Sequence, residues 1–184
     1  MLPRSCHLAG LFLLSLLSAR TGVTGDVPTT AGIWRTHEVR FQYQGFESVY
    51  ACDWLEAKML LLLDTSGARR HPNLTPSCRV LDRPATGAGV NMRFQTLAPD
   101  VAAADSGPTN AASAVSATWR VVTLRLNRPL SLEANDCELV EQFRDQVLPL
   151  FTTRNVVDRT NCRLGYNSAH DINLSFEVLV PATP

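Results

Sequence analysis

The chain has 184 residues, of which 45% are hydrophobic and 18% are charged, and its 17 basic side chains balance its 17 acidic ones. A hydrophobic fraction of this size supplies a globular core and excludes wholesale disorder. The balanced charge argues against nucleic-acid binding, which needs basic residues in excess and clustered on one face. The length fits one domain or two small halves.

The first 25 residues have the pattern of a secretory signal peptide. Arg4 precedes an apolar run over residues 8–17 that is too short to cross a bilayer, and small residues follow it. Cleavage after Ala19 or after Gly25 fits the pattern, and we take 1–25 as the signal. No later segment is long and apolar enough to span a membrane. The mature chain is therefore expected to be periplasmic or secreted, with no integral membrane segment.

Four cysteines follow this segment, and an even number favours two disulfides in an oxidising compartment: Cys52, Cys78, Cys137 and Cys162. The first two are 26 positions apart and the last two are 25 apart. These near-equal spacings predict that each pair closes a loop within its own half of the chain. No two cysteines have the C-x2-4-C spacing of a structural zinc site or the C-x-x-C spacing of a redox pair, so no metal and no cofactor is expected.

The surroundings of the two cysteine pairs repeat each other. Apolar residues alternate with polar ones upstream of each first cysteine, over 39–43 and 122–126, and again downstream of each second cysteine, over 90–94 and 172–180. Between the cysteines the apolar spacing changes to a helical period. Each half is therefore expected to read strand, helix, strand, and we predict an internal duplication.

The ends of the two predicted helices are marked by capping residues. Asp53 and Glu56 predict a capping box for the first helix, and Gly67 predicts its end. Asn135 and Glu138 predict the cap of the second helix. These caps would place Cys52 before the first helix and Cys137 inside the first turn of the second helix. Because the two halves are expected to be alike, one of the two predicted helix boundaries is wrong.

The expected fold class is α+β, with an antiparallel sheet covered on one face by two helices. In tandem the halves give the order βαβ-βαβ of the ferredoxin-like fold. Extra strands at 78–81 and 162–164 would instead give a duplicated βαββ sandwich. The first half spans 26–97 and the second spans 118–184, and we expect them to share one sheet. The segment 98–117, poor in large apolar groups and interrupted by Pro and Gly, is predicted to be a flexible linker.

The chain has neither a G-x-S-x-G nucleophile motif nor a phosphate-binding loop, so no catalytic residue is assigned. His37 begins the first predicted strand, and His170 and Asp171 precede the last one. Neighbouring strands would bring these three together as a two-histidine, one-carboxylate site. Glu138 and Glu141 are paired acids, whose ordinary role at a helix N-terminus is to interact with the helix dipole.

Aromatic side chains cluster around Gly45, and they are candidate ligand-binding residues: Tyr43, Phe46, Tyr50 and Trp54. Exposed on a loop, they would anchor a peptide or a glycan. Buried, they would fill the core. Both interpretations stay open.

A pattern of aromatic, acidic and cysteine residues runs through positions 41–58, with a weaker echo at 67–69 and at Cys78; its members are Phe41, Tyr43, Gly45, Phe46, Val49, Tyr50, Cys52, Asp53, Leu55, Glu56 and Lys58. This pattern resembles an uncharacterised family of small exported proteobacterial proteins. The resemblance implies export from a bacterial cell and implies no activity.

We therefore expect an exported, disulfide-stapled, non-catalytic binding or accessory domain whose partner is an envelope protein, a peptide or a glycan. Two alternatives stay open. One is a small envelope enzyme or metal-binding protein that uses His37, His170 and Asp171. The other is an envelope assembly or stress factor that binds a protein partner by adding a strand to a sheet edge.

Overall fold

The computed structural model describes residues 29–45, 50–70, 75–76, 87–100, 114–129, 131–162 and 171–183. The predicted signal peptide over 1–25 lies outside these residues, as do Phe46, Cys78 and His170. Within them, no helix is long and apolar enough to cross a membrane.

The described residues form two α-helices and seven strands, which confirms the α+β class. The elements are, in chain order, β1 (Thr30–Gln44), α1 (Cys52–Thr65), β2 (Arg69–Arg70), β3 (Thr75–Pro76), β4 (Gly87–Pro99), β5 (Val115–Arg125), α2 (Cys137–Gln146), β6 (Thr153–Asp158) and β7 (Asn173–Pro181). Two single 3-10 turns flank α2, namely η3 (Ala134–Asp136) and η4 (Leu148–Leu150).

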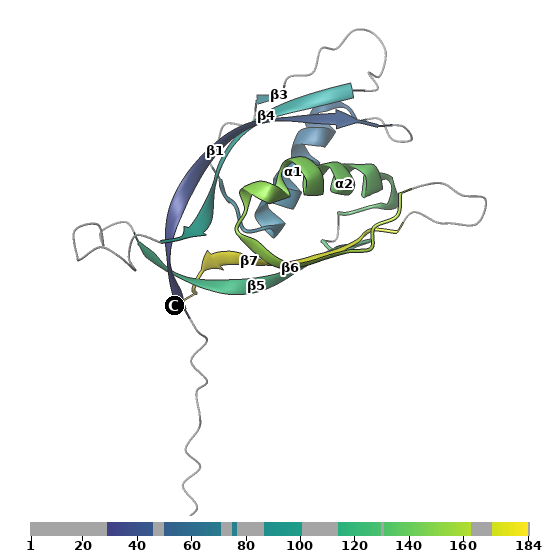
Figure 1. Ribbon diagram of the computed structural model, residues 1–184. Coiled ribbons are helices and arrows are strands. Elements are labelled where there is room, and N and C mark those ends of the chain that lie inside the picture. Colours follow the sequence, from purple (N-terminus) through teal and green to yellow (C-terminus); the bar gives the residue numbers. More distant parts are fainter. Residues whose placement is uncertain are drawn as a thin grey trace, which may run out of the picture.

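The strands form one antiparallel sheet in the order β2-β4-β1-β5-β7-β6, and β3 also pairs with β4. β1 pairs with β4 over residues 32–44 and 87–99, and β5 pairs with β7 along its whole C-terminal part. β1 and β5 are joined in the described chain by residues 30–32 and 115–117 alone. The sheet therefore consists of two half-sheets that meet at a short seam. Figure 1 shows that it bends around both helices, which lie on its concave side.

The strand order differs from the ferredoxin-like expectation. In that fold each βαβ unit is split, so its two strands are not neighbours. Here β1 and β4, the long strands on either side of α1, are direct antiparallel neighbours. The same holds for β5 and β7 on either side of α2. The alternative, halves with an additional short strand, agrees better with the observed element order.

Each half has its short strands at the outer side of its long returning strand. β2 and β3 pair with β4 in the first half, and β6 pairs with β7 in the second. For the short strand of the second half, the sequence predicts residues 162–164, but the observed strand β6 ends at Asp158, before Cys162. The corresponding expectation at 78–81 lies outside the described residues. The two halves thus share an order of pairing, and their origin by duplication stays a prediction.

Both helices begin at the first cysteine of a predicted pair, which resolves the conflict between the two predicted caps. Ala51 precedes α1 and makes no side-chain cap, so the predicted capping box of Asp53 and Glu56 is wrong. Before α2 the reciprocal capping bonds link Glu133 and Asp136, two positions earlier than predicted, and they cap the 3-10 turn η3. The error has a physical cause, because several acids near each start are able to cap and the sequence does not rank them.

Gly67 ends α1 as predicted. Its φ of 83° is in the left-handed region that favours glycine. The Gly67 N–H donates to the carbonyl of Asp64, and the Ala68 N–H donates to the carbonyl of Leu63. These are the two hydrogen bonds of a Schellman C-cap.

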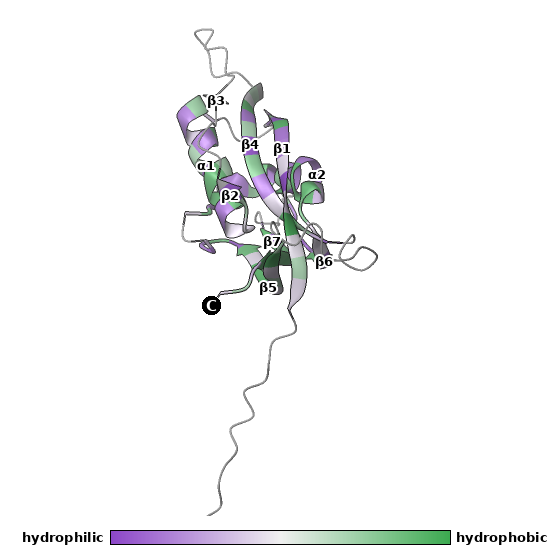
Figure 2. Ribbon diagram, turned by 90° about the vertical axis from the view of Figure 1, so that its left-hand side faces the viewer, coloured by the Kyte–Doolittle hydropathy of each residue, from purple (hydrophilic) through white to green (hydrophobic). Residues whose placement is uncertain are grey.

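The main core lies between the concave face of the sheet and the two helices. Both half-sheets and both helices contribute fully buried side chains, including Phe41, Tyr43, Leu55, Met59, Leu62, Phe94, Leu124, Leu139, Phe143 and Phe176. β5 and β7 are strongly hydrophobic where they lie side by side (Figure 2). One shared core thus holds the halves together.

The ends of the predicted linker belong to strands. β4 continues to Pro99 and β5 begins at Val115, so the segment between them is shorter than the predicted 98–117. Its middle, 101–113, lies outside the described residues.

Candidate functional site

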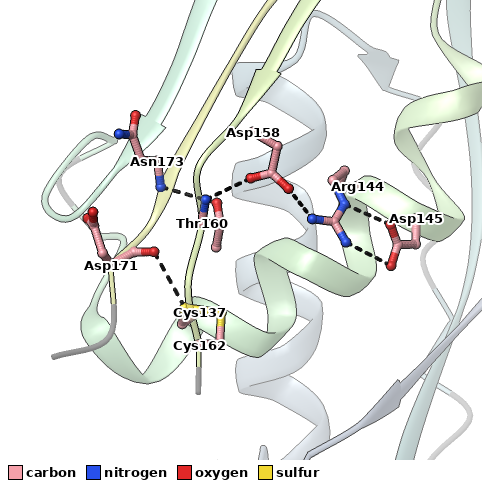
Figure 3. A network of polar contacts seen from close by, with 8 residues as sticks. All are labelled: Cys137, Arg144, Asp145, Asp158, Thr160, Cys162, Asp171 and Asn173. Carbon is pink, nitrogen blue, oxygen red and sulfur yellow. Dashed lines mark hydrogen bonds and ion pairs between the residues drawn. A yellow bond between two sulfur atoms is a disulfide. The ribbon is translucent and has the colours of Figure 1, made fainter. Parts of the chain in front are cut away.

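Cys137 and Cys162 form a disulfide, as their spacing predicts. It ties the first residue of α2 to the segment between β6 and β7 (Figure 3). Cys52 is also disulfide-bonded, and its predicted partner Cys78 lies outside the described residues. The N-terminus of α2 is therefore covalently fixed to the second half-sheet.

Polar contacts continue this connection along α2 (Figure 3). Arg144 bonds to Asp158 at the end of β6 and to Asp145, where Nε and Oδ1 are 2.7 Å apart. The Thr160 N–H donates to Asp158, and the Asn173 N–H donates to the Thr160 hydroxyl. Partial burial acts to raise the pKa of Asp158, but the hydrogen bonds from Thr160 and Arg144 prevail and lower it. Arg144 thus has both of its acidic partners on the second half.

The candidate aromatic residues are separated by the fold. Tyr43 is 2% exposed and packs edge-to-face on Tyr50, with 4.9 Å between ring centroids. Its hydroxyl donates to Glu138 at 3.2 Å. Trp54, on the first turn of α1, is 61% exposed. Tyr43 therefore belongs to the core, while Trp54 remains available to solvent.

A buried ion pair is hydrogen-bonded to one of these aromatic residues, Tyr50. The Lys58 ammonium donates to Asp136 at 2.6 Å and to the carbonyl of Ser131. The Tyr50 hydroxyl donates to the other Asp136 oxygen, and the Glu133 N–H donates to Asp136 as well. Burial, followed by the contact with Asp136, raises the pKa of Tyr50. Because Asp136 accepts a hydrogen bond on each oxygen, we interpret this cluster as a structural tie between the halves.

His37 has partners other than those of the predicted metal site. The Thr96 hydroxyl donates to the carbonyl of Leu150 at 3.0 Å, so it accepts from the His37 Nε2 proton at 2.8 Å. Burial, followed by the charge of Arg35, lowers the pKa of His37. Asp171 is exposed, and its main chain forms an isolated bridge with Asn161. In the described part of the chain, no three histidine, cysteine or acidic side chains are placed to hold a metal ion.

Two glutamines of α2, which the sequence reasoning did not single out, bond to the edge of β1. The Gln42 N–H donates to Gln146 Oε1 at 3.1 Å, and Gln146 Nε2 donates back to the Gln42 carbonyl at 2.9 Å. Gln44 exchanges the same two bonds with Gln142, each at 2.8 Å. Four helical residues rise about 6 Å and two strand residues about 6.6 Å, so the i, i+4 glutamines match alternate residues of the strand.

This pairing also identifies the open edge of β1. Residues 42 and 44 turn their main-chain groups away from β4, and so, by the alternation of an antiparallel ladder, do Thr36, Glu38 and Arg40. These three lie between the seam with β5 and the glutamines. No hydrogen bond from their outward main-chain groups to another described residue exists. Among the described residues, β1 therefore presents a strand edge that no other strand pairs with between the seam and the glutamines.

A cavity of about 470 Å³ adjoins the edge where the glutamines bind, and its lining is polar: Gln42, Gln44, Glu138, Glu141, Gln142, Asp145 and Gln146. Glu138 accepts from Tyr43, and Asp145 pairs with Arg144. Glu141 makes no hydrogen bond or ion pair with the described residues. Burial raises the pKa of Glu141, and the surrounding carboxylates add to this effect while Arg144 opposes it. The cavity is thus lined by three carboxylates, of which Glu141 makes no hydrogen bond or ion pair with the described residues.

The convex face of the sheet carries a second, smaller apolar cluster of Leu97, Ala117 and Leu179, covered by Trp34, Val115 and Trp119. Arg69 lies over the Trp34 ring at 5.5 Å, and Arg154 lies over the Trp119 ring at 4.2 Å. Trp119 follows Trp34 by 85 positions, and Arg154 follows Arg69 by the same 85. Cys137 follows Cys52 by 85 as well. This constant offset supports the predicted duplication.

Neither family models, nor curated proteins, nor solved structures match the chain. The resemblance of residues 41–58 to exported proteobacterial proteins therefore stays a prediction. The function has to be inferred from the geometry of the site.

Proposed function

We propose that the chain is an exported, non-catalytic binding module that holds an extended segment of a protein partner at the edge of β1. One observation carries this proposal. The outward main-chain groups of Thr36, Glu38 and Arg40 are unpaired among the described residues, and those of Gln42 and Gln44 are paired with side chains rather than with a strand.

Strand addition is the recognition mode that fits such an edge. Unpaired N–H and C=O groups in a row are a template for an incoming strand, which supplies main-chain hydrogen bonds. The side chains of Thr36, Glu38 and Arg40 are exposed, so an added strand would find them accessible. The edge belongs to a long strand that β4 holds along 13 residues, and this makes it a rigid surface.

The non-catalytic part of the proposal is supported by how the candidate catalytic groups are engaged. The His37 N–H is held by the Thr96 hydroxyl. Lys58, Asp136 and Tyr50 are bonded to one another in the interior. The disulfide between Cys137 and Cys162 fits an oxidising compartment, in agreement with the predicted signal peptide.

A proline at position 38 tests the proposal. The Glu38 N–H points away from β4, so Glu38→Pro removes a donor of the open edge and keeps the ladder with β4 intact. Nine-residue peptides selected from a random library on the mature chain are the probes, and binding is measured by fluorescence anisotropy. We expect Glu38→Pro to weaken their binding at least tenfold. Glu38→Ala, which retains the N–H, separates the main-chain effect from that of the side chain and is expected to stay within about twofold.

Circular dichroism and thermal melting of both variants show whether each has folded. If no selected peptide responds to Glu38→Pro in a folded variant, the edge of β1 is not the binding site and the proposal is wrong.

A further inference from the structure

We infer that Gln142 and Gln146 are a removable stopper on the β1 edge, and that the segment that displaces them is basic. This inference rests on the proposed function and adds to it the chemistry of the partner and the means by which the site is kept closed.

The glutamines occupy the positions that an added strand needs. Each carboxamide offers a carbonyl oxygen and N–H donors, as a peptide group does. Gln146 and Gln142 use these groups on both the N–H and the C=O of Gln42 and Gln44. A strand beside residues 42 and 44 would make the same hydrogen bonds. The stopper and the strand therefore exclude each other.

The stopper is able to leave without movement of the helix. All four of its hydrogen bonds are solvent-exposed, and each depends on a long, rotatable side chain. The helix itself is held by the disulfide at Cys137, by the buried Phe143 and by the bond from Arg144 to Asp158. Rotation of two side chains would thus open the edge from residue 36 to residue 44.

The charge of the adjoining cavity selects the segment that enters. Glu138, Glu141 and Asp145 line it beside Gln42 and Gln44. The Arg144 guanidinium, which lies beside this lining, is already bonded to Asp145 and Asp158. Glu141 is left for a cation brought by the partner. An extended segment with Arg or Lys at alternate positions would place charges along this wall while its backbone pairs with β1.

The test uses the mature chain and a nine-residue peptide of alternating Arg and Thr, with a Glu-Thr peptide of the same length as the charge control. We expect the Arg peptide to bind at least tenfold more tightly than the Glu peptide. Glu141→Gln should weaken the Arg peptide about fivefold and flatten its dependence on salt. Equal binding of the two peptides would contradict the inference that the partner segment is basic.

The stopper is tested by its removal. The Gln142→Ala/Gln146→Ala variant should bind the Arg peptide about tenfold more tightly than the wild type, because the competitor for the edge is gone. Gln142→Asn/Gln146→Asn, which keeps the carboxamides but shortens their reach, should behave in the same way. It is possible for Glu38→Pro to weaken the binding while neither double variant tightens it. In that case the stopper is refuted and the proposed function stands. If Glu38→Pro has no effect, the proposed function itself fails.

A measurement on the wild type covers the case in which the double variants do not fold. The side-chain NH₂ signals of Gln142 and Gln146 in an amide NMR spectrum should shift when the Arg peptide is added, as their bonds to Gln42 and Gln44 break. Signals that stay in place at saturation would contradict displacement.

Discussion

Lys58 on α1 and Asp136, immediately before α2, form a buried ion pair with 2.6 Å between Nζ and Oδ2. Lys58 is 7% exposed and Asp136 is 2% exposed. The pair joins an element of the first half to an element of the second through the middle of the fold. Loss of either partner would leave the other as an uncompensated charge in the interior.

Replacement of Lys58 by methionine is therefore expected to lower the free energy of unfolding by about 3–5 kcal/mol. Urea denaturation followed by circular dichroism measures the change. The Lys58→Met/Asp136→Asn variant is the matched control, and it should recover part of the loss because no charge stays buried and the amide oxygen still accepts a hydrogen bond from Tyr50 or Glu133. A single variant as stable as the wild type would show that the ion pair does not tie the halves together.

Loss of the second disulfide should also reduce stability. In the chain-entropy model, a bridge over 25 positions contributes roughly 3.5 kcal/mol. We expect Cys137→Ala/Cys162→Ala to lower the free energy of unfolding by about 2–5 kcal/mol. Urea denaturation measures the difference. No change would mean that the polar contacts of Arg144 suffice to hold α2.

The stability of the fold should depend on pH through His37. Burial lowers the pKa of His37 from its ordinary value of 6.5, so the folded state binds this proton less tightly than the unfolded chain. The free energy of unfolding should consequently be constant above 6.5 and fall as the pH drops below it, until the folded-state pKa is passed. Urea titrations over this range measure the slope. His37→Gln, which keeps an N–H donor for Thr96, should reduce this slope. An unchanged slope would mean that other titratable groups cause the dependence on pH.

Gly67 is expected to tolerate no side chain. A Cβ at this position would lie 2.6 Å from Val180 Cγ1, and the φ of 83° is unfavourable for alanine. Gly67→Ala should cost about 1–3 kcal/mol of unfolding free energy, measured by urea denaturation. Gly32→Ala is the control, since its nearest contact is 3.1 Å and its backbone is not left-handed. A larger loss at Gly32 than at Gly67 would contradict the importance of the C-cap.

Much of the local structure was predictable from the sequence, because buried apolar residues recur with the period of the helix or strand that carries them. Phe41 and Tyr43 alternate with polar residues and are buried on β1, and Val122 and Leu124 do the same on β5. The near-equal spacing of the two cysteine pairs predicted the disulfide between Cys137 and Cys162, because both cysteines of this pair lie within one half of the chain. Gly67 marked a helix end because few residues adopt its conformation.

The rest could not be predicted, because it depends on contacts between distant residues. Alternation says which side chains of a strand are buried but not which strands are neighbours, and so the ferredoxin-like order was inferred in error. Gln42 and Gln146 are 104 positions apart, and nothing in either neighbourhood indicates their contact. Lys58 is buried among the apolar residues of α1, and its distant partners Asp136 and the Ser131 carbonyl explain how it is buried there.

The offset of 85 between the Trp–Arg pairs places Ala57 opposite Gln142 and Leu61 opposite Gln146. The side chains of Ala57 and Leu61 are apolar, so these two positions of α1 cannot bond to a strand edge as Gln142 and Gln146 do. If the two halves arose by duplication, their helices have diverged at these positions, because α2 has two carboxamides that bond to β1 where α1 has two apolar side chains.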